Sequence, residues 1–381
     1  MDLLLRGADC LLPDGFAQAD VHLSDGRIAA LDPGTAAGLR SLDLTDYWIL
    51  PGVIDLHGDG FERHVAPRRG AINNLTAGLH QTEAELAANG ITTAYLAQFY
   101  SWEGGMRGPD FARAICQALQ GFAPIGTDMR LQLRFETHLL QDYDVIAGLV
   151  RDYAIDYMVM NDHLPHAALA AGKTPPRLTG QALKSGRSPD AHHALLRDLH
   201  AKAPQVPQAV ADLVARLAPL GLRFGSHDDS SADARAQAAA MGLTISEFPE
   251  NMDAAKAAQA QGAAVIMGAP NVLRGGSHKK NVSARDLIDA GVCDALASDY
   301  HYGAPVSAAQ LLAPNLGWAK AWHLISAGPA AVMGWDDRGT IAPGARADLV
   351  IMPKHGERIT ATIAGGRFTH LTHPLAGALL G

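Results

Sequence analysis

The sequence predicts an α/β protein: a (β/α)8 TIM-type barrel with a small β-sandwich domain built from both termini. Residues 51–335 alternate apolar strand candidates with Ala- and Leu-rich helical stretches, which is typical of a parallel sheet with right-handed crossovers. Eight strand candidates fall in this region, the number that closes such a barrel. The polar segment 164–205 follows the fourth strand, and we expect it to be an insertion that covers the barrel mouth.

The two ends of the chain differ from the middle. Residues 1–50 and 336–381 contain short strand candidates separated by turn residues, such as Asp25-Gly26 and Gly365-Gly366 at hairpin positions. Because both ends have this character, we expect them to assemble into one composite β domain. The barrel domain is then expected to span residues 51–335.

Composition narrows the class of protein. The chain has 381 residues, of which 48% are hydrophobic, and its net charge is −8. This predicts a globular protein with a large core and argues against a general nucleic-acid or membrane-surface binder. No apolar run approaches the ~20 residues that span a bilayer, and no signal-type segment is present. Three scattered cysteines indicate neither a disulfide framework nor a thiolate site, so we expect a cytoplasmic location.

Histidine and carboxylate residues stand at the carboxyl ends of several predicted strands, the face on which barrel active sites are built. A single histidine in such a place is more often a hydrogen-bonded structural residue, but several on one face favour a metal site. Nitrogen and oxygen ligands without thiolate suit zinc, manganese or iron(II). The candidate ligands are His57, Asp59, Glu136, His163, His227 and Asp299.

The ligand types suggest two divalent ions, with zinc preferred over manganese or iron. Glu136 has two oxygens and enough reach to bridge both cations. His57 and Asp59 would hold one ion, and His163 and His227 the other. Two cations that share a hydroxide provide a nucleophile at neutral pH.

Asp299 is the expected catalytic residue. It would contact the first ion and accept the proton of the attacking water, which is general-base work. Asp228 and Asp229 either orient His227 or are solvated loop acids. His64 and His138 are weaker candidates, and neither is expected to be a metal ligand.

Several motifs resemble the amidohydrolase superfamily. They are "PGVIDLHGD" on the first strand, "GITT" on the second, Asp299 on the eighth, and the closing "GTIAPGARADLVI". Most members carry His-x-His on the first strand, whereas this chain has Asp59 at the third position.

The aspartate at position 59 matches one branch of the superfamily. The motifs "LRFETH", "MNDH", "SHDD", "GAPNVLRGGSH" and "SDYH" resemble the PhnM family of the phosphonate carbon–phosphorus lyase pathway, nearly end to end. The resemblance implies hydrolysis of α-D-ribose 1-methylphosphonate 5-triphosphate to the 5-phosphate and diphosphate, by attack of a metal-bound hydroxide on the α-phosphorus. It implies the same six metal ligands. It is also compatible with a homo-oligomer and with partners from the same pathway.

A basic cluster fits a polyphosphate substrate. Arginines follow the first strand, and a glycine-containing basic loop follows the seventh, a common place for phosphate binding in barrels. The alternative is that the Gly-Gly pair is only a turn and that its lysines are solvated. The expected substrate-binding residues are Arg63, Arg68, Arg274, Gly275, Gly276, Ser277, His278 and Lys279.

Two other functions compete with phosphoryl transfer. A deaminase or cyclic amidase would use the same dinuclear centre on a C–N bond, and it predicts a neutral pocket. A catalytically dead relative could act as an oligomeric scaffold, but such relatives usually lose metal ligands. Every expected ligand position is filled here, which favours an enzyme.

Overall fold

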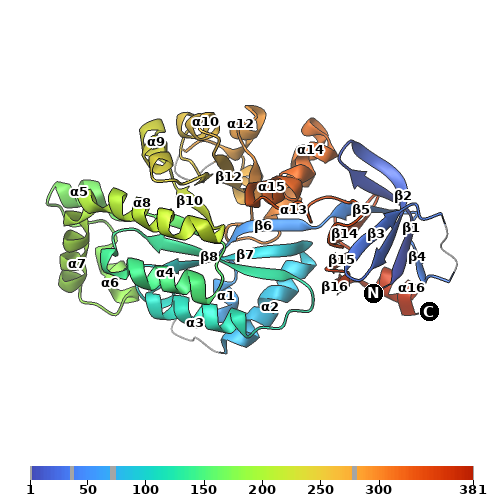
Figure 1. Ribbon diagram of the computed structural model, residues 1–381, viewed down its shortest axis with the longest axis horizontal. Coiled ribbons are helices and arrows are strands. Elements are labelled where there is room, and N and C mark those ends of the chain that lie inside the picture. The colour runs from blue at the N-terminus through green and yellow to red at the C-terminus, as the bar shows by residue number, and fades with distance from the viewer. Residues whose placement is uncertain (1, 35–37, 69–73, 277–280, 381) are drawn as a thin grey trace. The chain divides into compact units, whose positions relative to one another are not determined.

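The computed structural model describes residues 2–34, 38–68, 74–276 and 281–380. These residues form two sheets of eight strands, and no described helix is both long and apolar enough to cross a membrane (Figure 1). It divides into two compact units, which we call unit 1 and unit 2. Unit 1 comprises Met1–Leu96, Phe122–Arg130 and Ile266–Gly381, and unit 2 comprises Ala97–Gly121 and Leu131–Val265.

The first sheet belongs to unit 1 and is made by both ends of the chain. Its order is β16-β15-β14-β5-β1-β2-β3, and β4 pairs with β1. Antiparallel pairing of β5 with β14 joins the N-terminal strands to the C-terminal ones, seen in Figure 1 as blue beside red. The strands are β1 (Leu3–Leu12), β2 (Gly15–Ser24), β3 (Arg27–Leu31), β4 (Ser41–Asp43), β5 (Tyr47–Pro51), β14 (Leu349–Pro353), β15 (Ala361–Ala364) and β16 (Arg367–Leu371).

Two hairpins and a shared core hold this sheet together. Asp25-Gly26 and Gly365-Gly366 all have positive φ, as a two-residue hairpin turn requires. Alternate residues such as Leu3 and Leu5 pack with Ile351 in one buried cluster. The composite β domain predicted from sequence is confirmed, while its boundaries at residues 50 and 336 stay a prediction.

The second sheet is the barrel. Its eight strands follow one another in chain order, and a parallel bridge between Gly58 and Asp299 links its two ends, so the barrel is nearly closed. Every residue of β6 and β7 is buried, as expected for strands covered on both faces. The predicted fold class is confirmed. The strands are β6 (Val53–Gly58), β7 (Ile91–Tyr100), β8 (Asp128–Glu136), β9 (Tyr157–Asn161), β10 (Arg223–His227), β11 (Ile245–Glu247), β12 (Ala264–Gly268) and β13 (Ala295–Ala297).

Helices alternate with these strands, and polar caps begin several of them. Ser188, Ser231 and Asn251 each accept a backbone N–H of the first helical turn, which satisfies a donor that the helix leaves unpaired. The helices of unit 1 are α1 (Glu62–Val65), α2 (Leu75–Ala88), α11 (Ala269–Arg274), α12 (Ala284–Asp289), α13 (Ala304–Leu316), α14 (Trp318–His323), α15 (Ala327–Met333) and α16 (His373–Leu380). Those of unit 2 are α3 (Pro109–Gln120), α4 (Tyr143–Asp152), α5 (His166–Ala170), α6 (Leu178–Lys184), α7 (Pro189–Ala201), α8 (Val206–Leu217), α9 (Ala232–Ala240) and α10 (Met252–Ala260).

The polar insertion 164–205 is helical. It contains α5, α6 and α7, which Figure 1 shows together at one end of unit 2. Arg187 donates a hydrogen bond of 2.8 Å to the carbonyl of Trp102, and the rings of Trp102 and His192 lie 5.8 Å apart. These contacts tie the insertion to the loop that follows β7. Its role as a cover stays a prediction.

Candidate metal centre

Unit 1 brings together three of the predicted ligands. His57 is the penultimate residue of β6, Asp59 follows the strand, and Asp299 follows β13. The backbone N–H of Asp59 donates to the carbonyl of Asp299 at 2.9 Å, and that of Asp299 donates to the carbonyl of His57 at 2.8 Å. Residues far apart in the sequence are therefore adjacent at the ends of these two strands.

A buried carboxylate holds this arrangement. Asp55 accepts hydrogen bonds from the backbone N–H of Ser298, at 2.8 Å, and from its hydroxyl. Burial raises the pKa of Asp55, although the Ser298 hydrogen bonds oppose the shift. The pair fixes the end of β13 against β6, and with it the loop that carries Asp299.

Three non-glycine residues with left-handed backbone lie at barrel strand ends. Asp228 follows β10 directly, Phe248 follows β11, and Asp299 follows β13, with φ values of 57°, 54° and 56°. Such conformations are uncommon outside glycine and cluster at functional sites. They turn the chain sharply where side chains must be aimed.

Unit 2 brings Glu136 and His163 into direct contact. Glu136 ends β8 and is fully buried, and its Oε1 is hydrogen-bonded to His163 Nδ1. Its Oε2 accepts from Trp102 Nε1 and from the backbone N–H of His163, both at 3.2 Å. Burial alone would lower the pKa of His163, but the hydrogen bond and charge of Glu136 outweigh burial and raise that pKa.

His227 completes this cluster. Its ring lies 5.9 Å from the ring of His163, and Asp228 Oδ1 lies 3.4 Å from its Nδ1. Possible ligand atoms of His163, His227 and Asp228 all lie within 4.8 Å of one another. Burial, together with the Arg134 guanidinium 3.0 Å from Nε2, lowers the pKa of His227 and favours the neutral imidazole that binds metals.

The structure separates the roles of Asp228 and Asp229, which the sequence left open. Asp228 lies beside His227, as described above. Asp229 is buried, accepts hydrogen bonds from the hydroxyls of Ser226 (2.8 Å) and Ser246, and lies 3.5 Å from buried Arg235. It is therefore neither a solvated loop acid nor a direct partner of the histidine, and it ties β10 to α9 and β11.

Sequence reasoning missed several polar neighbours on the inner face of β8. Gln132, Arg134 and Glu136 are spaced by two residues and so share a face of the strand. Gln132 donates to Glu247, which also accepts a hydrogen bond from the hydroxyl of Tyr157, both at 2.5 Å. The alternation of polar residues along "LQLRFE" was the signal that could have found them.

Two of the predicted phosphate-binding arginines meet at one tyrosine of unit 1. Arg63 donates to the carbonyl of Tyr300 at 3.1 Å and also pairs with Glu85. Arg274 donates to the Tyr300 hydroxyl. Tyr300 is 49% exposed and directly follows Asp299 in the sequence, the expected proton acceptor.

The other predicted substrate-binding residues are less constrained. Arg68 is exposed. Gly275 ends α11 with a φ of 71°, and a side chain there would meet open space, so glycine serves the turn rather than a close packing contact. Gly276 follows it. Ser277, His278 and Lys279 lie outside the described residues.

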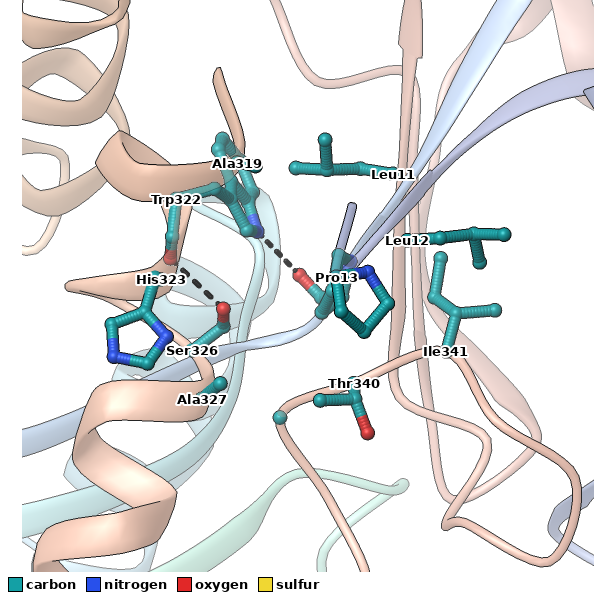
Figure 2. A pocket seen from close by; sticks show the side chains of 12 residues that line it. Leu11, Leu12, Pro13, Ala319, Trp322, His323, Ser326, Ala327, Thr340 and Ile341 are labelled. Atoms are coloured by element: carbon teal, nitrogen blue, oxygen red, sulfur yellow. Dashed lines mark hydrogen bonds between the residues drawn. The ribbon is translucent and has the colours of Figure 1, made fainter. Parts of the chain in front are cut away.

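A cavity of about 120 Å³ lies elsewhere in unit 1 (Figure 2). It is lined mainly by apolar side chains such as Leu11 and Ile341, and its edge carries hydrogen bonds from Trp322 Nε1 to the Pro51 carbonyl and from the Ser326 hydroxyl to the Trp322 carbonyl. No carboxylate is among the described residues that line it. The cavity therefore lacks the chemistry expected of the metal centre.

Comparison with solved structures identifies the fold of the chain. An amidohydrolase from an environmental sample of the Sargasso Sea covers 100% of this chain with a TM-score of 0.66, 17% identity and 97% of its own chain. N-acetylglucosamine-6-phosphate deacetylase from Pasteurella multocida covers 97%, with a TM-score of 0.62, 12% identity and 99% of its own chain. The chain thus has the fold of these proteins. The His and carboxylate clusters of its described residues could hold metal ions.

One curated relative is similar to this chain over nearly its whole length. The chain is 28% identical over 367 residues to the α-D-ribose 1-methylphosphonate 5-triphosphate diphosphatase of Escherichia coli (strain K12), covering 94% of this chain and 97% of that protein. No family model matches the sequence. The resemblance to the PhnM family that the motifs predict is therefore confirmed over nearly the whole chain.

Proposed function

We propose that this protein hydrolyses the triphosphate of a phosphorylated sugar, taking α-D-ribose 1-methylphosphonate 5-triphosphate to the 5-phosphate and diphosphate. The convergence of Arg63 and Arg274 on Tyr300, beside Asp299, carries the choice of a polyanionic substrate. A neutral C–N substrate would not need two guanidinium groups at this place. The choice of sugar rests on the name of the relative.

The donor set fits divalent metal ions. Its side chains offer only nitrogen and oxygen atoms, burial lowers the pKa of His227, and the possible ligand atoms of His163, His227 and Asp228 lie close together. Zinc suits these donors best, and manganese or iron would also be accepted. When bound, such ions supply Lewis acidity and lower the pKa of water. The proposed ligands are His57, Asp59, Glu136, His163, His227 and Asp299.

The chain's own residues orient the groups and move the proton. Trp102 and His163 fix the carboxylate of Glu136. Arg63 and Arg274 neutralise phosphate charge, which phosphoryl transfer requires more than covalent help. Water attacks the α-phosphorus, the anhydride bond to the β-phosphorus breaks, and diphosphate leaves. Asp299 accepts the proton of the water.

Phosphorus NMR with labelled water tests this reaction. Metal-loaded protein is incubated in H₂¹⁸O with a ribosyl 5-triphosphate, with nucleoside 5′-triphosphates, and with amide and aminopurine substrates. We expect diphosphate release with ¹⁸O in the sugar monophosphate, because attack occurs at the α-phosphorus. Release of single phosphate, ¹⁸O in the diphosphate, or ammonia from the nitrogen-containing substrates would refute the proposal.

A further inference from the structure

A second histidine–carboxylate cluster lies in unit 2. Asp162 follows β9, and its carboxylate lies 2.8 Å from Nε2 of His166 on α5. Asp162 Oδ1 lies 3.6 Å from Nδ1 of His138, in the turn after β8. Possible ligand atoms of these three residues lie within 4.8 Å of one another. Nδ1 of His166 in turn lies 2.7 Å from Nδ1 of His200 on α7.

His138 points to a ligand in this cluster. Its side chain is 3% exposed, and neither ring nitrogen has a hydrogen-bond partner among the described residues. Leaving a buried polar group unsatisfied costs about 1–3 kcal/mol, so such a group requires an explanation, often an ion or a water. Nδ1 of His138 lies 3.6 Å from the Asp162 carboxylate, which His166 also contacts.

The pairing of His166 with His200 leaves Nε2 of His166 available for an ion in one of the two tautomers of His166. When Nδ1 of His166 donates its proton to His200, the lone pair on Nε2 faces the carboxylate of Asp162. Two electron-rich groups 2.8 Å apart repel each other unless a positive species lies between them. A proton between them would satisfy His166 and Asp162 alone, whereas a metal ion would also bind His138.

We propose that His138, Asp162 and His166 bind a divalent transition metal of the zinc type, with His200 as the positioning residue for His166. Zinc bonds of about 2.0–2.2 Å set tetrahedral ligand atoms roughly 3.3–3.6 Å apart. The Asp162 carboxylate lies 2.8 Å from His166 Nε2 and 3.6 Å from His138 Nδ1, so these two separations need change by less than about 1 Å. A histidine ligand that donates its other ring N–H to an acceptor is the usual arrangement. The Asp162 side chain is 44% exposed, which gives water access to a fourth position.

This site would fasten the insertion to the barrel strands within unit 2. Its ligands come from the ends of β8 and β9 and from α5, and α5 packs against α7, which carries His200 (Figure 1). An ion bound there would link α5 to the ends of β8 and β9 through metal–ligand bonds. No side chain is shared with the ligands proposed for catalysis, so the inference goes beyond the proposed function.

Metal stoichiometry of the full chain tests the site. Wild type, His166→Asn and His227→Asn are stripped with a chelator, reloaded with Zn²⁺ and passed over a desalting column, and zinc is measured by plasma mass spectrometry. We expect the His166→Asn protein to bind one equivalent of zinc less than wild type and to keep the zinc that is bound through His227. The double variant should lack both the zinc bound through His166 and the zinc bound through His227. Circular dichroism checks that each variant is folded.

A matched control and a second readout keep the test specific. His193→Asn changes a histidine of the same helix as His200, outside the cluster, and should bind as much zinc as wild type. His200→Gln should weaken zinc at this site about 10- to 100-fold while keeping the visible spectrum of the Co²⁺-substituted protein. The spectrum depends on which ligands hold the metal. A general structural disturbance would change the spectrum and lower the affinity, whereas loss of a positioning residue should lower the affinity alone.

Equal zinc content and affinity in wild type and His166→Asn would overturn the proposal, because the cluster would then be a hydrogen-bonded network only. A loss of zinc in His193→Asn equal to that in His166→Asn would overturn it too. Failure of the proposed function leaves these results unaffected, because no substrate is used. Conversely, a protein that lacks this site can still release diphosphate.

Discussion

Two polar clusters of unit 2 arise from the same two strands yet differ in their surroundings. Glu136 ends β8 and His138 follows in the next turn, while Asp162 and His163 are neighbours after β9. In the first cluster the Glu136 side chain is 0% exposed and that of His163 is 31% exposed. Asp162, on the side of the insertion, is 44% exposed. The neighbouring residues Asp162 and His163 contact His166 and Glu136, respectively, so the segment after one strand supplies both clusters.

The difference in burial separates the expected roles. Charge interactions are stronger where water is excluded, so the buried Glu136 cluster suits transition-state stabilisation. The half-exposed Asp162 cluster suits an ion that fastens one segment to another. Chemistry and anchoring can therefore be tested separately by substitutions in adjacent residues.

The largest expected effect comes from a carboxylate of the buried cluster. Glu136→Gln should lower kcat on the triphosphate by more than about 10³-fold, because bound metal supplies several kcal/mol of charge stabilisation and each 1.36 kcal/mol is a factor of ten. Asp162→Asn should have a much smaller effect on kcat while losing zinc. Steady-state kinetics and metal analysis of both variants check this, and equal losses of kcat would remove the distinction between the clusters.

The next effect concerns the proton acceptor in unit 1. Asp299→Asn should lower kcat by about 10²–10⁴-fold and retain at least one metal ion, because the amide cannot take a proton from water. Asp289→Asn, an exposed acid at the end of α12, is the control and should leave kcat unchanged. Near-normal kcat in Asp299→Asn would exclude this role.

Binding of the triphosphate should respond more modestly. Arg274→Ala should raise KM by about 10- to 100-fold, since a hydrogen bond to a charged group contributes about 1.5–3 kcal/mol, and it should leave the metal content unchanged. Arg358→Ala removes an exposed positive charge elsewhere and controls for net charge. If both variants have the same KM as wild type, phosphate binds at another place.

The smallest effect sets the baseline for any pH study of the clusters. Burial raises the pKa of Asp348 to about 6, although Arg346 opposes the shift. The folded state then holds this proton more tightly than the unfolded state. The free energy of unfolding should therefore fall as the pH rises from about 4 to 6, by at most about 3 kcal/mol.

Asp348→Asn should remove this part of the pH dependence, because the amide does not titrate in this range. Denaturant unfolding of metal-free wild type and variant at pH 4.5 and pH 7 measures it. The same change between the two pH values in both proteins would show that Asp348 does not contribute.

The sequence by itself determined the barrel, the composite β domain and the polar strand ends. Strand and helix periods are local properties, and the carboxyl ends of parallel strands must share one face, so residues such as His57, Glu136 and Asp299 could be assigned to that face without coordinates. The hairpin turns at Gly26 and Gly366 need positive φ, which glycine adopts without strain.

Only the tertiary structure decided which side chains touch. The contact of Glu136 with His163, the meeting of Arg63 with Arg274 at Tyr300, and the pairing of His166 with His200 join residues from separate elements. No sequence period encodes such pairs, because they depend on how strands and helices pack and which rotamers that packing allows. For the same reason His138, unremarkable in the sequence, became the clearest sign of a second metal site.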